Sequence, residues 1–116
     1  MEEKLGKVII APNVLVTIAR LTALSTPGVV RMSPAWTESM GRLLRRRSPG
    51  EGVKIGVEND AVSVDLYIVV EQGVDILKLS REIQAEVSRA IHDMVGMEVK
   101  EVNIHIQDVA TSSGEG

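Results

Sequence analysis

The chain has 116 residues and a formal net charge of −3, and it contains one tryptophan, one tyrosine and no cysteine. A chain of this length forms a single domain, and the lack of cysteine excludes disulfides and thiolate metal sites. The acidic balance disfavours general binding to DNA or to anionic membranes. We expect no membrane insertion and no secretory signal, because no apolar run has the required length or flanking charges.

The first third of the chain predicts a strand, a helix and a second extended run. Alternating side chains predict a short strand at 6–10. Pro12 suits the first turn of a helix that reaches about Leu24, although Ala11 is a weak N-cap. Its apolar stripe consists of Leu15, Ile18, Ala19 and Thr22, with Val14 and Leu21 beside it. Turn residues at 25–28 end the helix, and 29–33 is again extended.

The middle of the chain predicts a β-hairpin after an irregular segment. Residues 36–44 have enough apolar side chains for a helical turn or two, but Gly41 and the arginines make this helix marginal. The turn residues at 48–52 indicate a loop. Beyond it, two alternating runs flank a tight turn at 58–61, which predicts paired strands over 53–57 and 62–70.

The last third predicts a helix that leads directly into a strand. Apolar residues recur at helical spacing, and they are Ile76, Leu79, Ile83, Val87, Ala90, Ile91 and Met94. Gly96 is suited to the left-handed conformation that ends a helix. The strand covers 99–107, with Val102, Ile104 and Ile106 on its apolar side.

This order of elements predicts an α+β fold, a two-layer sandwich in which two helices pack on one face of a mixed four- to five-stranded sheet. We expect a flexible N-terminus at 1–5, one domain at 6–109 and a disordered polar tail at 110–116. The predicted core brings together Leu66, Ile68, Ile83, Val87, Ile91 and Ile104.

Short motifs along most of the chain resemble those of one bacterial family. In order, they are GKVIIAP at 6–12, PGV at 27–29, MS at 32–33, GVKI at 52–55, EQG at 71–73, IQAEV at 83–87, MVGM at 94–97 and VNI at 102–104. No single motif is specific, but their order and spacing over about a hundred residues resemble the alkaline shock protein (envelope stress response) family.

The resemblance implies a non-catalytic bacterial stress protein without cofactors. Members of that family are cytoplasmic, and some are held at the inner face of the membrane by a separate anchor protein. We therefore expect a cytoplasmic scaffold or adaptor that self-associates and binds protein partners, with a membrane-anchored protein among the candidates.

The candidate partner contact is an arginine-rich segment next to the only tryptophan. Arg42, Arg45, Arg46 and Arg47 place four positive charges within six residues, and guanidinium groups bind planar anions bidentately. Trp36 precedes them, and a tryptophan beside arginines is typical of a protein-contact hot spot. The alternatives are a solvated basic segment, a tryptophan buried in the core, and a small RNA-binding α+β module. We rank RNA lower because the chain is acidic and nearly lacks aromatic platforms for bases.

The second candidate surface is the sheet face away from the predicted helices. It carries Tyr67, Val69, Asn103 and His105, which are the candidate self-association residues. The alternative is an ordinary solvated face of a sheet. His92 and His105 are the only imidazoles and lie on different elements, so the sequence predicts neither a metal site nor a catalytic group. Asp65 and Glu101 share this face, where we expect them to serve solubility.

Overall fold

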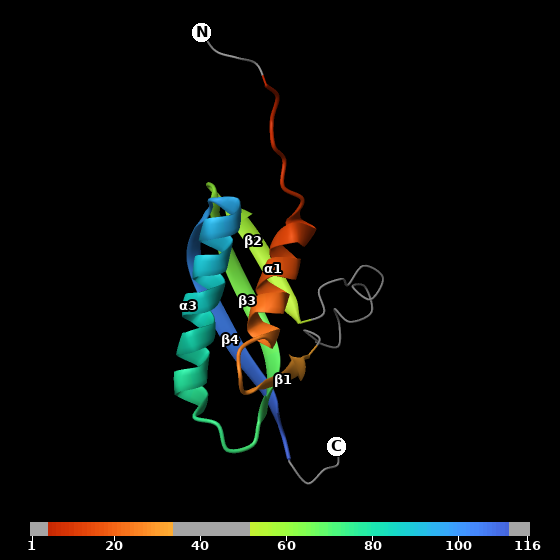
Figure 1. Cartoon of the computed structure of the whole chain (residues 1–116), viewed down its shortest axis with the longest axis vertical. Helices are drawn as coiled ribbons and strands as arrows, with labels where there is room; N and C mark the ends of the chain where they lie inside the picture. The colour runs from red at the N-terminus through yellow and green to blue at the C-terminus, as the bar shows by residue number, and fades with distance from the viewer. Residues whose placement is uncertain (1–4, 34–51, 112–116) are drawn as a thin grey trace.

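The computed structural model describes residues 5–33 and 52–111. Within these residues the chain forms two helices and four strands (Figure 1). In chain order, the elements are α1 (Pro12–Leu24), β1 (Val29–Met32), β2 (Val53–Glu58), β3 (Ala61–Glu71), α3 (Ile76–Val95) and β4 (Glu98–Ala110). Both helices lie on the same face of one sheet, which confirms the predicted α+β two-layer fold.

The strand β3 is the centre of a mixed sheet. Along one edge it pairs in parallel with β4 over its whole length, from Ala61–Glu98 to Glu71–Ala110. Along the other edge it pairs antiparallel with two short strands, β2 opposite its first half and β1 opposite its end. This arrangement gives the sheet two outer edges, one formed by β4 and one shared by β1 and β2.

The strands β1 and β2 are nearly continuous along their edge of the sheet, although 18 residues separate Ser33 from Gly52. The backbone of Tyr67 bridges them: its carbonyl accepts from Ser33 N–H at 2.8 Å, and its N–H donates to the Gly52 carbonyl at 2.9 Å. Gly52 has a φ of +82°, and a Cβ at this position would lie 2.6 Å from the Ser33 carbonyl oxygen. Only glycine fits this junction without distortion.

The two helices begin in different ways. Pro12 occupies the first turn of α1 as predicted, and Ala11 provides no side-chain cap. At the start of α3, the Asp75 carboxylate accepts from Lys78 N–H at 3.1 Å, a standard N-cap that satisfies one unpaired helix donor. At its other end, Gly96 adopts the predicted left-handed conformation with φ 78°.

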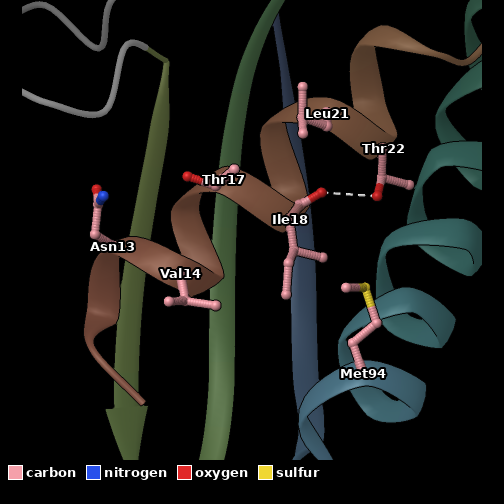
Figure 2. A pocket seen from close by; sticks show the side chains of 7 residues that line it. All are labelled: Asn13, Val14, Thr17, Ile18, Leu21, Thr22 and Met94. Atoms are coloured by element: carbon pink, nitrogen blue, oxygen red, sulfur yellow. Dashed lines mark hydrogen bonds between the residues drawn. The ribbon is translucent and has the colours of Figure 1, made fainter.

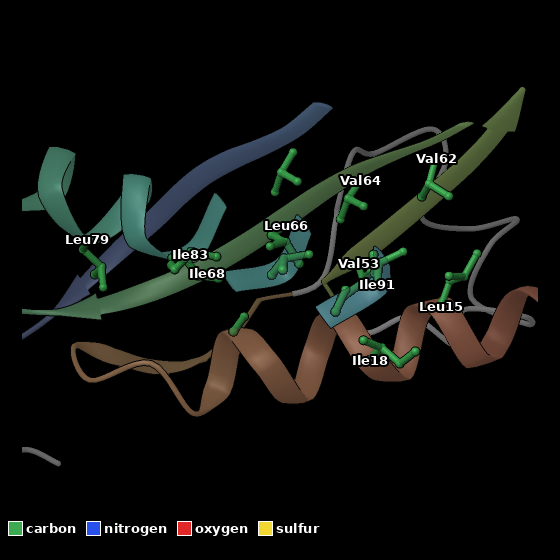
Figure 3. Close-up of a cluster of buried hydrophobic side chains, with 14 of the residues drawn as sticks. Leu15, Ile18, Val53, Val62, Val64, Leu66, Ile68, Leu79, Ile83 and Ile91 are labelled. Carbon is green, nitrogen blue, oxygen red and sulfur yellow. The ribbon is translucent and has the colours of Figure 1, made fainter. Parts of the chain in front are cut away.

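The core fills the space between the helices and the sheet (Figure 3). Its largest fully buried side chains come from β3 and α3: Leu66, Ile68, Ile83, Ile91, Val62, Val64, Val70 and Val87. Five of the six residues in the predicted core are therefore confirmed, and the sixth, Ile104, packs against the same cluster while partly buried. Gln84 ties α3 to β4 by donating to the Val102 carbonyl at 3.1 Å.

Three sequence expectations differ from the structure. The predicted strand at 6–10 is wrong, because these residues pair with no other strand among those described and remain exposed. A strand needs a hydrogen-bonded neighbour, and β-branched side chains alone cannot supply one. Met94, expected in the buried stripe of α3, is 70% exposed, since it lines an open hollow beside α1 instead of the core. The strand expected to end at Gln107 continues to Ala110.

Candidate interaction surface

The sheet face opposite the helices carries a polar cluster at the centre of the β3–β4 pair. Asp65 is the register partner of Asn103, and Tyr67 is the register partner of His105. Side chains two residues apart on a strand share a face, so the parallel register brings these four onto one face, where all are half-buried.

Asp65 is the hub of this cluster. Its Oδ1 atom accepts from the Asn103 amide at 3.1 Å and lies 3.0 Å from His105 Nε2. The side chain of Asp65 is 31% exposed and that of His105 38%. At this exposure the ion pair that forms when His105 is protonated contributes little net stability. The cluster therefore orients side chains more than it stabilises the fold.

The rings of Tyr67 and His105 stack on each other. Their centroids are 4.2 Å apart and their planes differ by 7°. The contact of His105 with Asp65 restrains the imidazole ring, and stacking on that ring restrains the phenol ring of Tyr67. A flat, ordered aromatic pair that stays partly exposed loses little conformational entropy on contact, which is the property that makes tyrosine common at protein interfaces.

Val69 continues β3 beyond the cluster but is only 3% exposed. It lies next to a register shift between Ile68 and Val69 in the β3–β4 pair. Val69 therefore adds almost no exposed apolar surface, and its prediction as an accessible self-association residue is wrong. The other three predicted residues, Tyr67, Asn103 and His105, lie together on the open face and are partly exposed.

The chemistry available to the described part of the chain is limited. No group of three or more His, Asp and Glu side chains in residues 5–33 and 52–111 is placed to hold a metal ion. His92 is exposed on α3, where its Nδ1 is 3.7 Å from the neighbouring Asp93. Glu101 lies opposite Ser63 in the register, so Asp65 makes its contacts with an amide and an imidazole and not with a second carboxylate.

The predicted partner contact lies outside the described residues. Trp36 and the four arginines of 42–47 all belong to the segment between Ser33 and Gly52. The sequence places Asp65 on the same face as Tyr67 but indicates only a role in solubility for it. Its contacts with Asn103 and His105 could not be predicted, because they depend on the parallel pairing of β3 with β4.

Taken together, the described residues form a small two-layer α+β sandwich domain with an ordered polar patch on its open sheet face. Over residues 1–111 the chain matches the alkaline shock protein family, which is described as having a cell envelope-related function. The chain therefore belongs to this family, and the resemblance seen in its motifs is confirmed.

Curated bacterial relatives agree with this family. The chain is 33% identical over 102 residues to the uncharacterized protein YqhY of Bacillus subtilis, covering 88% of this chain and 76% of the relative. It is 31% identical over 108 residues to the uncharacterized protein Spy1535 of Streptococcus pyogenes serotype M6, covering 92% and 81%. The uncharacterized protein YloU of Bacillus subtilis is 25% identical over 115 residues, covering 97% and 96%.

Among solved structures, a MamM-CTD variant has a similar fold. It aligns with a TM-score of 0.51 at 11% identity, and the match covers 84% of this chain and 98% of that one. At this identity the likeness supports the α+β architecture alone. In the part of the chain that the structure describes, neither helix has the length and apolar character needed to span a bilayer.

Proposed function

We propose that the protein is a non-catalytic scaffold or adaptor in a cell envelope-related process, and that it acts by self-association and by binding protein partners. The observation that carries this proposal is the ordered Tyr67–His105 stack, held by Asp65 on the open face of the sheet. The family's envelope-related function supports the setting. A cytoplasmic location, with attachment to the membrane through a protein partner, is part of the same proposal.

The contact on the open face is between two copies of the chain. A sheet face meeting its own copy is an isologous interface, in which the same residues contribute from both sides. The uncharged side chains of Tyr67 and Asn103 suit such a contact, because neither brings a charge against the same residue of the second copy. Asp65 is compensated locally by Asn103 and His105, so burial of the patch does not leave that carboxylate without hydrogen-bond partners.

Sedimentation velocity over a concentration series tests this contact. The variant Asn103→Lys places a long charged side chain at the centre of the patch. We expect its self-association to weaken at least about tenfold, because the lysine and the neighbouring Asp65 carboxylate would both lose their hydration in the contact. The matched control is Ala85→Lys, which introduces the same residue at an exposed, uncharged position of α3, on the other side of the sheet (Figure 1). Equal association of wild type and Asn103→Lys would overturn the sheet-face contact.

The non-catalytic part of the proposal has its own test. A broad screen of hydrolase, transferase and redox substrates should give no turnover above background. His105→Ala provides the check, since His105 has a carboxylate partner and is the described side chain best placed for proton transfer. Turnover by wild type that disappears in folded His105→Ala would show that the protein is an enzyme.

A further inference from the structure

The helical face has a shallow apolar groove where α1 meets the C-terminal end of α3. The hollow has a volume of about 420 Å³ and is lined by side chains of α1 together with Met94 of α3 (Figure 2). Met94 is 70% exposed, and Leu21 and Val14 on α1 are 54% and 42% exposed. These three apolar residues lie beside the buried stripes of their helices and converge on one hollow.

The polar groups of this groove do not prevent an apolar occupant. The Thr22 hydroxyl donates to the Ile18 carbonyl of its own helix at 2.7 Å (Figure 2). Because that hydroxyl already has a partner, Thr22 needs no hydrogen bond from a ligand. The groove therefore presents a mainly aliphatic surface to solvent, and association with another aliphatic surface would release water from both.

The same chain carries a second apolar surface without cover. Residues 5–10 precede α1 in an extended course away from the body of the protein. Leu5, Val8 and Ile9 are 90%, 88% and 82% exposed. Single exposed apolar residues are common, but a contiguous group on one short segment marks an interaction site.

The junction between this segment and α1 keeps it away from its own groove. Ala11 is extended, with φ −71° and ψ 144°, and a residue before proline is restricted to such conformations. The groove begins at Asn13 and follows α1 away from its start. For residues 5–10 to lie in the groove of their own chain, the backbone would have to reverse direction at Ala11. A turn placed earlier would have to be formed by the apolar residues of the segment, which could then not enter the groove.

We infer that residues 5–10 of one copy dock in the α1–α3 groove of a second copy, and that two copies exchange these segments reciprocally. The occupant is an aliphatic extended segment, the receptor is an aliphatic groove, and both belong to the same chain. A reciprocal exchange is closed by a twofold axis and covers both exposed surfaces at once. This contact is on the opposite side of the sheet from the Tyr67–His105 patch and does not depend on it.

Engineered cysteines test this exchange, because the chain has none of its own. One full-length chain carries Ile9→Cys, and a second, distinguished by a larger tag, carries Met94→Cys. Mild oxidation of the mixture should give a disulfide heterodimer. The matched control replaces Met94→Cys by Lys54→Cys, an exposed position on β2, and should give at least about tenfold less heterodimer.

Each other result overturns the inference. Equal yields with Met94→Cys and Lys54→Cys would indicate random collision or docking elsewhere. An intramolecular disulfide alone, in a chain carrying both Ile9→Cys and Met94→Cys, would mean that the segment folds onto its own groove. Absence of any heterodimer at high protein concentration would mean that the groove takes no such segment.

A second measurement does not depend on cross-linking. In the Asn103→Lys background, in which the sheet-face contact is weakened, sedimentation velocity should show that Ile9→Asp raises the dissociation constant about tenfold or more, because one large aliphatic side chain no longer enters the groove. Ile9 is 82% exposed in the single chain, so the circular dichroism spectrum should show an unchanged fold. Lys7→Gln on the same segment is the control, and an unchanged dissociation constant in Ile9→Asp would contradict the exchange.

Discussion

Tyr67 and His105 lie at the same level of neighbouring parallel strands, and their rings stack 4.2 Å apart. They are 38 positions apart in the chain, and the whole of α3 lies between them. The stack therefore depends on the β3–β4 register. It also depends on the packing of α3, which holds β4 in place beside β3. If variants that lack these rings lose only little free energy of unfolding, the open face is ordered by the sheet and not by the rings.

The first prediction concerns the strength of this stack. In a double-mutant cycle with Tyr67→Ala and His105→Ala, we expect a coupling free energy of about 0.5–1.5 kcal/mol, the range of aromatic pairs. Urea unfolding of the four proteins provides the measurement. A parallel cycle with Tyr67→Leu separates ring stacking from the loss of bulk, and additivity of the two alanine changes would mean that the rings do not interact in solution.

The second prediction concerns the centre of the core. Ile83 is fully buried between α3 and the sheet. Truncation of Ile83→Ala should lower the free energy of unfolding by roughly 2–5 kcal/mol, through lost burial and the cavity that remains. On the same helix Leu77 is 63% exposed, so Leu77→Ala should cost less than about 0.5 kcal/mol. Similar costs for the two variants would contradict the orientation of α3.

The β2–β3 hairpin and the helix α3 were predictable because their sequence signals are local. The paired strands around Asn59 and Asp60 follow from a two-residue turn in which both residues have positive φ, 52° and 68°, a conformation that asparagine and aspartate tolerate. The helix α3 follows from its periodic apolar residues and from Gly96. Its N-cap, Asp75, is a local signal as well, because an aspartate directly before an apolar helical pattern is typical of a helix start.

The remaining features depend on distant parts of the chain. No local pattern shows that β4 pairs in parallel with β3, so the contact of Asp65 with His105 could not be foreseen. The strand predicted at 6–10 fails for the same reason, since its composition favours a strand but the described fold offers it no neighbour. The periodic patterns place Leu21 and Met94 in or beside buried stripes, and both are exposed because they flank a hollow that neither helix fills.

The third prediction concerns the junction at Gly52. Gly52→Ala should destabilise the fold by about 2 kcal/mol or more, because it combines a strained positive φ with a Cβ directed at the Ser33 carbonyl. Thermal or urea unfolding measures this cost. Gly56, within β2, has open space around its missing Cβ, so Gly56→Ala should be neutral or slightly stabilising. Equal effects of Gly52→Ala and Gly56→Ala would mean that the backbone at Gly52 does not have this conformation in solution.

The last prediction separates a protein partner from RNA as the target of the arginine-rich segment. Each arginine that neutralises a single-strand phosphate contributes about 0.7 to the slope of log affinity against log salt, so four would give roughly −3. We expect weak RNA binding that barely changes when Arg42, Arg45, Arg46 and Arg47 are all replaced by glutamine, together with loss of an acidic protein partner captured from native lysate.

A charge-matched control makes this test specific. Replacing Lys54, Lys78, Arg81 and Lys100 by glutamine removes the same four charges from exposed positions on three other elements. If only the local charge at 42–47 matters, this control should still bind the protein partner. An effect of net charge would instead weaken partner binding equally in both variants. Tight RNA binding with a slope near about −3, lost in the first variant and kept in the control, would instead favour an RNA-binding module.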